Sequence, residues 1–362
     1  MKIILITKSK IKDIPPLISV AHIMADLGHD VEVITSEVNL QLAESFIKKN
    51  IKYVEFPFAS ATSPIKKVYE YYMFRKKVFN HLKNTEFDLL WIEGAHTIRS
   101  LGEGIKEFKY VLQISELHTG HTAQLKAIGK VIHNAVRVVM PEYNRTVIYK
   151  TWFKLKIRPT VLPNKPYIVP NKELLKNLKK KIFNNYIELK EKKIILYQGL
   201  IDRDRDLSNF IKAVKELGED YIFVMVGKDG GMVEHYKKID NNIVHIDFMP
   251  VPDYFVFTAN AHIGILSYDS NILNNAYCAP NKIYEYGYFA LPMIGNDIPG
   301  LKYSIKSSKA GIIVDEEDIT SIKNAIQKID ADYENYSKAS KDLFDKCDNR
   351  TTINEIIRSI KN

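Results

Sequence analysis

The chain has 362 residues, of which 46% are hydrophobic and 26% charged, so it is long enough for two or three globular domains with cores of their own. Its two cysteines, Cys278 and Cys347, exclude a disulfide-dense secreted framework and favour a reducing compartment. No apolar run approaches the length of a membrane span, and residues 1–7 are typical of a first strand rather than a signal peptide. We therefore expect a cytoplasmic protein.

The net charge of +9 is carried by one half of the chain. Residues 1–163 contain 24 Lys and Arg against 15 Asp and Glu, whereas residues 164–362 contain 28 of each kind. This asymmetry predicts an anionic partner for the first half: membrane lipid, a phosphate-bearing acceptor or nucleic acid. The alternative is a lysine-rich composition that serves no partner.

Strand and helix patterns alternate through the first half. Short apolar runs, typical of a parallel sheet covered on both faces, occur at 2–7, 31–35, 52–56, 88–92, 110–114 and 136–140. Helical patterns fall between them, at about 16–28, 40–49, 64–84, 97–107, 122–134 and 142–153. The alternation predicts a doubly wound α/β domain over residues 1–163.

Three prolines within 159–166 interrupt this pattern, because proline continues neither a helix nor a central strand. We predict a linker and a lysine-rich polar helix over 164–192, followed by a second α/β domain over 193–350. Its strands are expected at 193–198, 221–226, 243–246, 263–266, 293–294 and 311–314. Two helices, at about 333–346 and 351–361, close the chain.

One stretch of the second half combines a helix start with charged groups. In Pro280-Asn-Lys-Ile-Tyr-Glu285, Pro280 suits a first helical position, and Asn281 and Lys282 lie in the first turn, where backbone N–H groups favour an anion. Glu285 follows one turn later. A phosphate at the helix start and a hydroxyl pair near Glu285 would describe a bound nucleotide sugar.

Pro280–Glu285, followed by Ala290-Leu-Pro292, resembles the donor-site signature of GT-B glycosyltransferases of the retaining "family four" type, the glycosyl transferases group 1. The resemblance is clear over about 193–330 and looser over 1–163. It implies two Rossmann-like doubly wound domains facing across a cleft, an acceptor-side domain over 1–163 and a nucleotide-sugar donor domain over 193–350. It also implies that the helix in 351–362 crosses back to the first domain. The alternative is an ordinary helix–strand turn with a surface lysine and glutamate.

The resemblance implies donor contacts after the strand at 193–198. Gly199 leads a turn there, and Arg205 matches a basic residue that points at the donor diphosphate. Leu200 replaces the family's other basic residue, so one phosphate contact is missing or Arg203 supplies it, unless both arginines belong to a solvated loop of ion pairs. The other implied donor contacts are Gly227, Phe248, Met249, Pro280, Asn281, Lys282, Ile283 and the ribose-binding Glu285.

Three further positions concern the chemistry. Tyr277 stands where the family's sugar-contacting glutamate is expected. Glu116 or, as the second choice, His118 matches a polar residue facing the reactive sugar, unless these are helix-start residues. With Arg205 and Lys282 they complete the expected catalytic set. The resemblance implies front-face attack assisted by the donor's own phosphate, so catalysis is positioning and stabilisation of the leaving diphosphate. We expect no metal or other cofactor, since no metal-ligand cluster is visible.

Two basic stretches of the first half point to anionic ligands. Lys8, Lys10 and Lys12 stand where many relatives have a glycine loop, and they contact phosphate, an anionic acceptor or only water. The helix predicted at 64–83 carries an apolar stripe, Ile65, Val68, Tyr72, Phe79 and Leu82, beside the cations Lys66, Lys67, Arg75, Lys76, Lys77 and Lys83. It resembles an interfacial membrane helix, or else its stripe packs on the sheet, and both can hold together.

The sequence thus predicts a retaining glycosyltransferase that uses a nucleotide-diphosphate sugar and a glycan or lipid-linked acceptor. The expected setting is bacterial surface polysaccharide or lipopolysaccharide synthesis, in the cytoplasm or peripherally on the inner leaflet of the cell membrane. An anionic membrane surface is a further expected partner, and nucleic acid is not. The alternatives are a non-catalytic sugar-binding or scaffolding subunit of the same fold, and a nucleotide-sugar epimerase.

Overall fold

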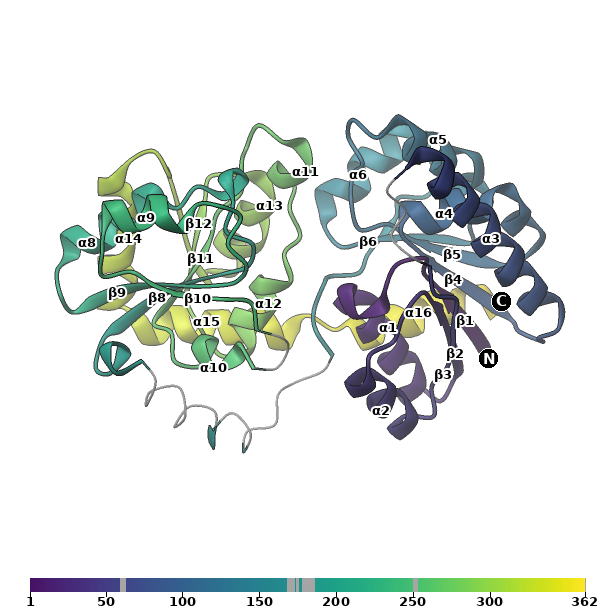
Figure 1. Cartoon of the computed structure of the whole chain (residues 1–362), viewed down its shortest axis with the longest axis horizontal. Helices are drawn as coiled ribbons and strands as arrows, with labels where there is room; N and C mark the ends of the chain where they lie inside the picture. Colours follow the sequence, from purple (N-terminus) through teal and green to yellow (C-terminus); the bar gives the residue numbers. More distant parts are fainter. Residues whose placement is uncertain (59–62, 168–172, 174–175, 178–185, 250–252, 362) are drawn as a thin grey trace. The chain divides into compact units, whose positions relative to one another are not determined.

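The computed structural model describes residues 1–58, 63–167, 173, 176–177, 186–249 and 253–361, so the polar helix predicted within 164–192 lies largely outside the described residues. The chain divides into two compact units. The first unit comprises Met1–Tyr167 together with Asp348–Asn362, and the second comprises Ile168–Cys347. Both are parallel sheets with helices, which confirms the predicted pair of doubly wound α/β domains (Figure 1).

The first unit is built on a seven-stranded parallel sheet of order β3-β2-β1-β4-β5-β6-β7. Its strands are β1 (Lys2–Ile6), β2 (Asp30–Thr35), β3 (Lys52–Glu55), β4 (Leu89–Glu93), β5 (Tyr110–Gln113), β6 (Arg137–Met140) and β7 (Thr160–Val161). In register, Ile3 of β1 pairs with Val31 on one side and Leu89 on the other. The strand order therefore reverses direction between β1 and β4, which is the topological switch point of a doubly wound sheet.

The helices of the first unit are α1 (Pro15–Asp26), α2 (Leu40–Lys48), α3 (Pro64–Lys83), α4 (Ala95–Leu101), α5 (Thr122–Val131), α6 (Tyr143–Trp152) and α16 (Asn349–Lys361). Side-chain oxygens of Asn39 and Ser63 accept from the first-turn backbone N–H groups of α2 and α3, which explains where these helices begin. The helix predicted at 97–107 instead gives way to a 3₁₀ turn at Gly102, whose φ of 62° favours glycine.

The last helix of the chain belongs to the first unit. Ile353, Ile356 and Ile357 of α16 are buried in the same core cluster as the apolar residues of α1. At the start of α16, Arg350 donates to the Asp26 carbonyl at 3.0 Å, and Asn349 donates to the Pro163 carbonyl at 2.8 Å. The C-terminal residues therefore close the core of the unit that the N-terminal residues begin.

Helix α3 carries two apolar stripes rather than one. Tyr71, Phe74, Val78 and Leu82 are buried against the unit. A second set, Ile65, Val68, Tyr69 and Tyr72, is 84%, 62%, 63% and 59% exposed. Of the predicted stripe, Leu82 is buried and Phe79 partly buried, whereas Ile65, Val68 and Tyr72 are exposed. The alternative that this stripe packs on the sheet therefore holds only for its C-terminal part.

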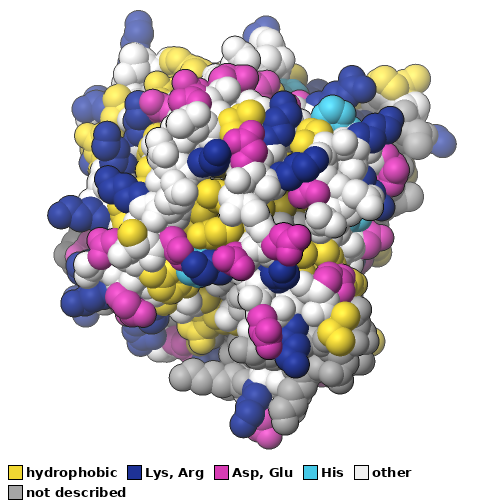
Figure 2. Space-filling model, turned by 90° about the vertical axis from the view of Figure 1, so that its left-hand side faces the viewer, with side chains coloured by type: hydrophobic (Ala, Val, Ile, Leu, Met, Phe, Trp, Pro, Cys, Tyr) yellow, Lys and Arg dark blue, Asp and Glu magenta, His cyan; other side chains and the backbone are white. Residues whose placement is uncertain are grey.

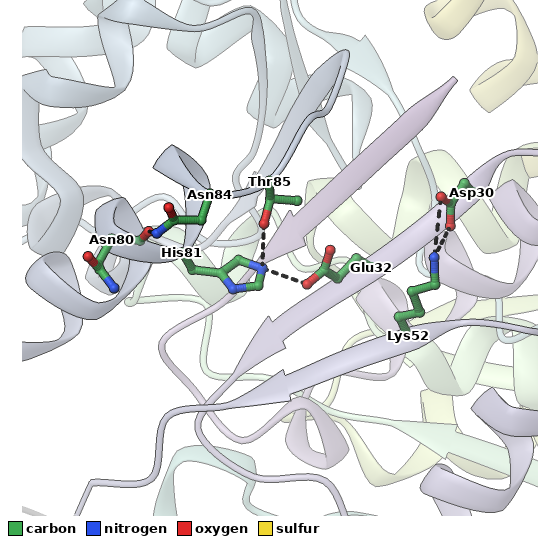
Figure 3. A network of polar contacts seen from close by, with 7 residues as sticks. All are labelled: Asp30, Glu32, Lys52, Asn80, His81, Asn84 and Thr85. Carbon is green, nitrogen blue, oxygen red and sulfur yellow. Dashed lines mark hydrogen bonds and ion pairs between the residues drawn. The ribbon is translucent and has the colours of Figure 1, made fainter.

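Polar contacts fix the end of α3 to the sheet. The imidazole of His81 lies 2.6 Å from a carboxylate oxygen of Glu32, a buried residue of β2, and 3.5 Å from the Thr85 hydroxyl (Figure 3). On the same strand, Asp30 faces Lys52 of β3 at 3.4 Å. A buried carboxylate needs such a partner, so the Glu32–His81 contact anchors α3 against β2.

The second unit has a six-stranded parallel sheet of order β10-β9-β8-β11-β12-β13. The strands are β8 (Lys193–Gln198), β9 (Tyr221–Val226), β10 (Val244–Ile246), β11 (Ile263–Leu266), β12 (Met293–Asn296) and β13 (Gly311–Val314). The helices are α8 (Ser208–Leu217), α9 (Val233–Ile239), α10 (Phe255–Thr258), α11 (Leu273–Ala276), α12 (Asn281–Tyr288), α13 (Pro299–Leu301), α14 (Ile319–Ala331) and α15 (Tyr333–Lys346). Figure 2 shows charges of both signs interleaved over one face of this unit, as its balanced composition leads one to expect.

Two glycines set the position of α12. A Cβ at Gly264 in β11 would lie 2.5 Å from the ring of Tyr286, and one at Gly287 would lie 2.8 Å from the Ser340 carbonyl oxygen. Both distances are far below van der Waals contact, so only glycine lets α12 approach β11 on one side and α15 on the other. The Tyr286 ring is fully buried as a result.

Within the described residues, no helix combines the length and the apolar character that crossing a membrane requires.

Candidate functional site

The carboxyl end of β8 meets the first turn of α12 at Gly199. This glycine has a φ of 135°, and a Cβ on it would lie 3.1 Å from Lys282 Nζ and 3.6 Å from a guanidinium nitrogen of Arg205. Gly227, after β9, packs so closely on the Gly199 carbonyl that a side chain there would collide with it. Because both residues are glycines, the side chains of Lys282 and Arg205 can lie directly beside this backbone turn.

Lys282 has an unusual environment for a lysine. Although the residue as a whole is partly exposed, its Nζ is buried and has no hydrogen-bond partner among the described residues. The Nζ lies 4.5 Å from the Tyr197 ring centroid and 5.5 Å from that of Tyr268. Burial, reinforced by the Arg205 charge, lowers the pKa of Lys282 to about 7. An anion placed here would satisfy the amine and favour its charged form.

Arg205 completes the cation pair, whereas Arg203 does not join it. The Arg205 guanidinium carbon lies 5.2 Å from the Tyr268 ring centroid, so Tyr268 holds both cations. Arg203, two residues earlier in the same 3₁₀ turn, is exposed. The second cation beside the turn is thus Lys282 from α12, while Leu200 is 42% exposed and carries no charge.

Glu285, one turn along α12, ends a buried polar network. Its Oε2 accepts from the Gln198 side-chain amide at 2.7 Å and its Oε1 from the Tyr254 hydroxyl at 2.9 Å. Gln198 in turn accepts from Thr258 at 2.8 Å. Burial raises the pKa of the Glu285 carboxyl, while the bonds from Tyr254 and Gln198 and the charge of Lys282 act against that rise. Each carboxylate oxygen keeps acceptor capacity for a further hydroxyl group.

The remaining donor candidates lie either at the start of α12 or just after β10. Pro280 caps α12 rather than starting it, and Asn281 opens the helix. Ile283 is buried in the core, so only its backbone can meet a ligand. The Phe248 side chain is 70% exposed, but its backbone N–H donates to Asp247, and Met249 is partly buried against the core. The residues directly after Met249 lie outside the described chain.

Glu116 and His118 follow β5 in the first unit. Neither begins a helix, because α5 starts at Thr122, so their interpretation as helix-start residues is wrong. Glu116 is exposed and lies 3.4 Å from Arg145, which also donates to the Ser115 carbonyl. Burial, reinforced by the proximity of His96, His121 and Arg145, lowers the pKa of His118 to about 4, so His118 is neutral at pH 7.

The six cations predicted on α3 have different surroundings. Five are exposed and Lys77 is half-buried; the exposed ones are Lys66, Lys67, Arg75, Lys76 and Lys83. The guanidinium of Arg75 lies 5.6 Å from the Phe79 ring centroid, and Lys77 Nζ lies 5.2 Å from that of Phe58. Lys66, Lys67, Lys76 and Lys83 are therefore the ones left to meet a partner by charge.

Sequence reasoning missed the polar and aromatic wall of the site in the second unit. Tyr197 and Gln198 end β8, Tyr268 follows β11, and Tyr254 precedes α10. Gln198 carried a usable signal, since it is a polar residue at the carboxyl end of an otherwise apolar strand. Over the described residues, no group of three or more His, Cys, Asp or Glu side chains is arranged to hold a metal ion.

Residues 179–343 match the family model of glycosyl transferases group 1. This match spans the Gly199 turn, the cation pair and Glu285. The chain carries a group 1 glycosyltransferase domain. A search of curated protein sequences gives no match.

Solved structures show that the whole chain shares the GT-B fold with glycosyltransferases. Sucrose-phosphate synthase from Thermosynechococcus elongatus superimposes with a TM-score of 0.74 at 14% identity, over 100% of this chain and 99% of that one. Anabaena HepE in complex with UDP-glucose gives 0.71 at 13% identity, over 100% and 98%. WaaG, a glycosyltransferase involved in lipopolysaccharide biosynthesis, gives 0.68 at 15% identity, over 99% and 100%. The group 1 domain and the shared fold together identify the protein as a transferase enzyme.

Proposed function

We propose that the protein is a retaining glycosyltransferase that moves a sugar from a nucleotide-diphosphate sugar to a glycan or lipid-linked acceptor. The observation that carries the proposal is the pair of cations at Gly199, with a buried carboxylate one helical turn away. A nucleotide sugar has the matching order of groups, a diphosphate followed by a ribose with two hydroxyls. The relation to HepE, whose structure contains UDP-glucose, supports the same class of donor.

In this proposal the diphosphate lies against Lys282 and Arg205. The unpartnered amine of Lys282 donates hydrogen bonds to phosphate oxygens, and the guanidinium of Arg205 offers a planar pair of donors. Glu285, oriented by Gln198 and Tyr254, accepts from the ribose hydroxyls. Each group thus acts on a different part of the donor.

The transfer itself then needs charge stabilisation more than a protein nucleophile. The bond between the anomeric carbon and the phosphate oxygen breaks, and the acceptor oxygen bonds to the same face of that carbon. The acceptor proton passes to the leaving phosphate, so a glycoside and a nucleoside diphosphate are the products. Lys282 and Arg205 would stabilise the charge that develops on the leaving group. Glu116 or the neutral His118 would face the reacting sugar.

We also propose that no metal ion or other cofactor is needed. Two side-chain cations beside the turn supply the neutralisation that a divalent ion supplies in other phosphate sites. Activity should therefore survive chelation by EDTA, and a loss restored by added Mg²⁺ would contradict this.

The proposed acceptor setting is bacterial surface polysaccharide or lipopolysaccharide synthesis, with peripheral attachment to the inner leaflet of the cell membrane. The exposed stripe of α3 supports it, since Ile65, Val68, Tyr69 and Tyr72 recur on one helical face beside Lys66 and Lys67. Such a face can enter the headgroup region of an anionic leaflet. WaaG, of similar fold, is involved in lipopolysaccharide biosynthesis.

A donor screen tests the proposal. UDP-, GDP- and dTDP-sugars would be added to the full chain, with thermal stabilisation and slow donor hydrolysis as the two measurements. We expect one nucleotide series to give both responses, and Arg205→Gln to weaken both. Stabilisation without hydrolysis would favour a non-catalytic sugar-binding subunit, for which Tyr277 in place of the sugar-contacting glutamate is the specific argument. No response to any donor would refute the assignment.

A further inference from the structure

Three side chains that can carry positive charge meet in the first unit, whereas the site described above is built from residues of the second unit. The strand order of this unit reverses between β1 and β4, and ligands of doubly wound sheets bind beyond the carboxyl ends of strands at such a point. Lys8 follows β1 and His96 and Arg99 lie in α4, directly after β4. The Lys8 backbone N–H donates to the Thr97 hydroxyl at 2.8 Å, which ties the loop after β1 to α4.

Tyr71 of α3 is the common centre of this group. Lys8 Nζ lies 5.1 Å from the Tyr71 ring centroid, and the guanidinium carbon of Arg99 lies 5.2 Å from it. The Tyr71 hydroxyl is 2.7 Å from His96 Nδ1, so this hydrogen bond fixes the imidazole. We call Lys8, Tyr71, His96 and Arg99 the switch-point cluster. Its three nitrogen-bearing groups come from the loop after β1 and from helix α4, and all lie near one ring.

The charge around this cluster is mostly positive. Partial burial lowers the pKa of His96, and the charges of Lys67, Lys8, Arg99 and His121 lower it further. Opposing them is Glu70, 3.4 Å from Lys8. Glu93 is buried and accepts from Thr7, and burial raises its pKa to about 7, so it carries only part of a charge at neutral pH. Glu116 lies against Arg145 instead.

The other lysines of the same loop differ from Lys8. Lys10 and Lys12 both pair with Glu37, at 2.5 and 2.8 Å, and are solvent-exposed. The Lys8 side chain is only 13% exposed. Of the three lysines that replace the glycine loop, Lys8 alone joins the cluster, so the loop provides a matched internal control.

We propose that the switch-point cluster binds a phosphate group carried by the acceptor. A guanidinium, an ammonium and an imidazole gathered around one tyrosine suit the several oxygens of a tetrahedral dianion. This inference rests on the proposed function, because it names the class of acceptor for that reaction. The phosphate belongs either to a phosphorylated sugar or to a lipid phosphate, and the experiment separates these sources.

The test follows the His96 imidazole signal of the full chain by NMR during titration with inorganic phosphate at constant ionic strength. The His96→Gln variant assigns that signal, and UDP added in excess keeps phosphate from the proposed donor site. We expect a saturable shift whose Kd rises at least tenfold in Lys8→Gln and in Arg99→Gln. Lys10→Gln, with the same charge change in the same loop, should stay within twofold. Arg99→Lys should bind with intermediate strength.

Two outcomes would overturn the inference: no saturable shift, or equal weakening in Lys10→Gln, which would reveal only general attraction by charge. The affinities of glucose 6-phosphate and geranyl phosphate are then compared, with glucose as the uncharged control. The compound that binds more tightly shows whether the phosphate belongs to a sugar or to a lipid. Donor affinity is measured separately on the same variants. If the unchanged chain binds the donor but not phosphate, this inference alone is refuted, whereas absence of donor binding by the unchanged chain refutes the proposed function.

Discussion

Replacing Lys282 by methionine should stabilise the fold and weaken donor binding at the same time. Methionine keeps a similar length and apolar stem but removes the amine whose Nζ is buried without a hydrogen-bond partner. The ordinary pKa of 10.5 falls to about 7 in the folded chain. At about 1.4 kcal/mol per pKa unit, burying the charged form costs the fold roughly 4 to 5 kcal/mol at low pH. The variant avoids that cost.

The pH dependence gives the sign of the effect. Between pH 7 and pH 10.5 the unfolded chain holds the Lys282 proton and the folded chain releases it, so the native protein gains stability as pH rises through this window. The advantage of Lys282→Met should therefore be largest below pH 7 and vanish near pH 10.5. Donor affinity should fall by about 10- to 150-fold, the worth of a charge-assisted hydrogen bond of about 1.5 to 3 kcal/mol.

Hydrogen exchange over the peptides of β8 and β11, measured by mass spectrometry at pH 6, 7.5 and 9, reports the opening free energy of the second unit. Calorimetric titration with the donor nucleotide reports affinity. The exposed Lys306 supplies the control, because Lys306→Met changes the charge equally without relieving a buried amine. If Lys282→Met destabilises the second unit, or if its effect does not vary with pH, the amine is not the uncompensated group described above.

Three further changes test other parts of the molecule. Glu285→Gln should leave the fold intact but lower donor affinity about tenfold or more in a nucleotide titration, since an amide accepts less well than a carboxylate; unchanged affinity would remove the ribose assignment. Ile65→Ser should reduce binding to anionic vesicles in a sedimentation assay, whereas Leu40→Ser, at an equally exposed apolar position on α2, should not. His81→Ala should cost the first unit about 1 to 3 kcal/mol by leaving the buried Glu32 carboxylate without this partner. Urea unfolding followed by tryptophan fluorescence measures that cost, because both tryptophans lie in the first unit.

The fold was predictable because its strands are short apolar runs of the kind that parallel sheets bury on both faces. The run 193–198 is an example, since every residue from Ile194 onward is buried. The proline-rich stretch was predictable only as an interruption. Thr160–Val161 nevertheless forms an edge strand there. A run of two residues between prolines is too short to predict a strand.

The site was predictable where its residues are neighbours in sequence and not where strands bring them together. Lys282 and Glu285 share one helix, so their spacing was readable. That Lys282 rather than Arg203 lies beside Gly199 depends on the packing of α12 on β11, which the sequence does not show. The aromatic residues that hold the cations come from the ends of separate strands for the same reason.

The packing of helix α3 was predicted only in part, for a different reason. Its tyrosines and phenylalanines produce two apolar stripes at helical spacing, one exposed and one buried. Hydrophobic periodicity identifies the helix but does not tell which stripe meets the sheet when aromatic residues lie on both sides.

The two glycines that fix α12 couple functions that look separate. Lys282 and Glu285 both lie on the short helix α12. The contacts that hold this helix leave no space for even a methyl group at Gly264 or Gly287. A shift of α12 would therefore displace the proposed phosphate and ribose contacts together and in the same direction. Donor preference in this protein should consequently change through substitutions in the loops around the helix, while substitutions beneath it act on the whole donor at once.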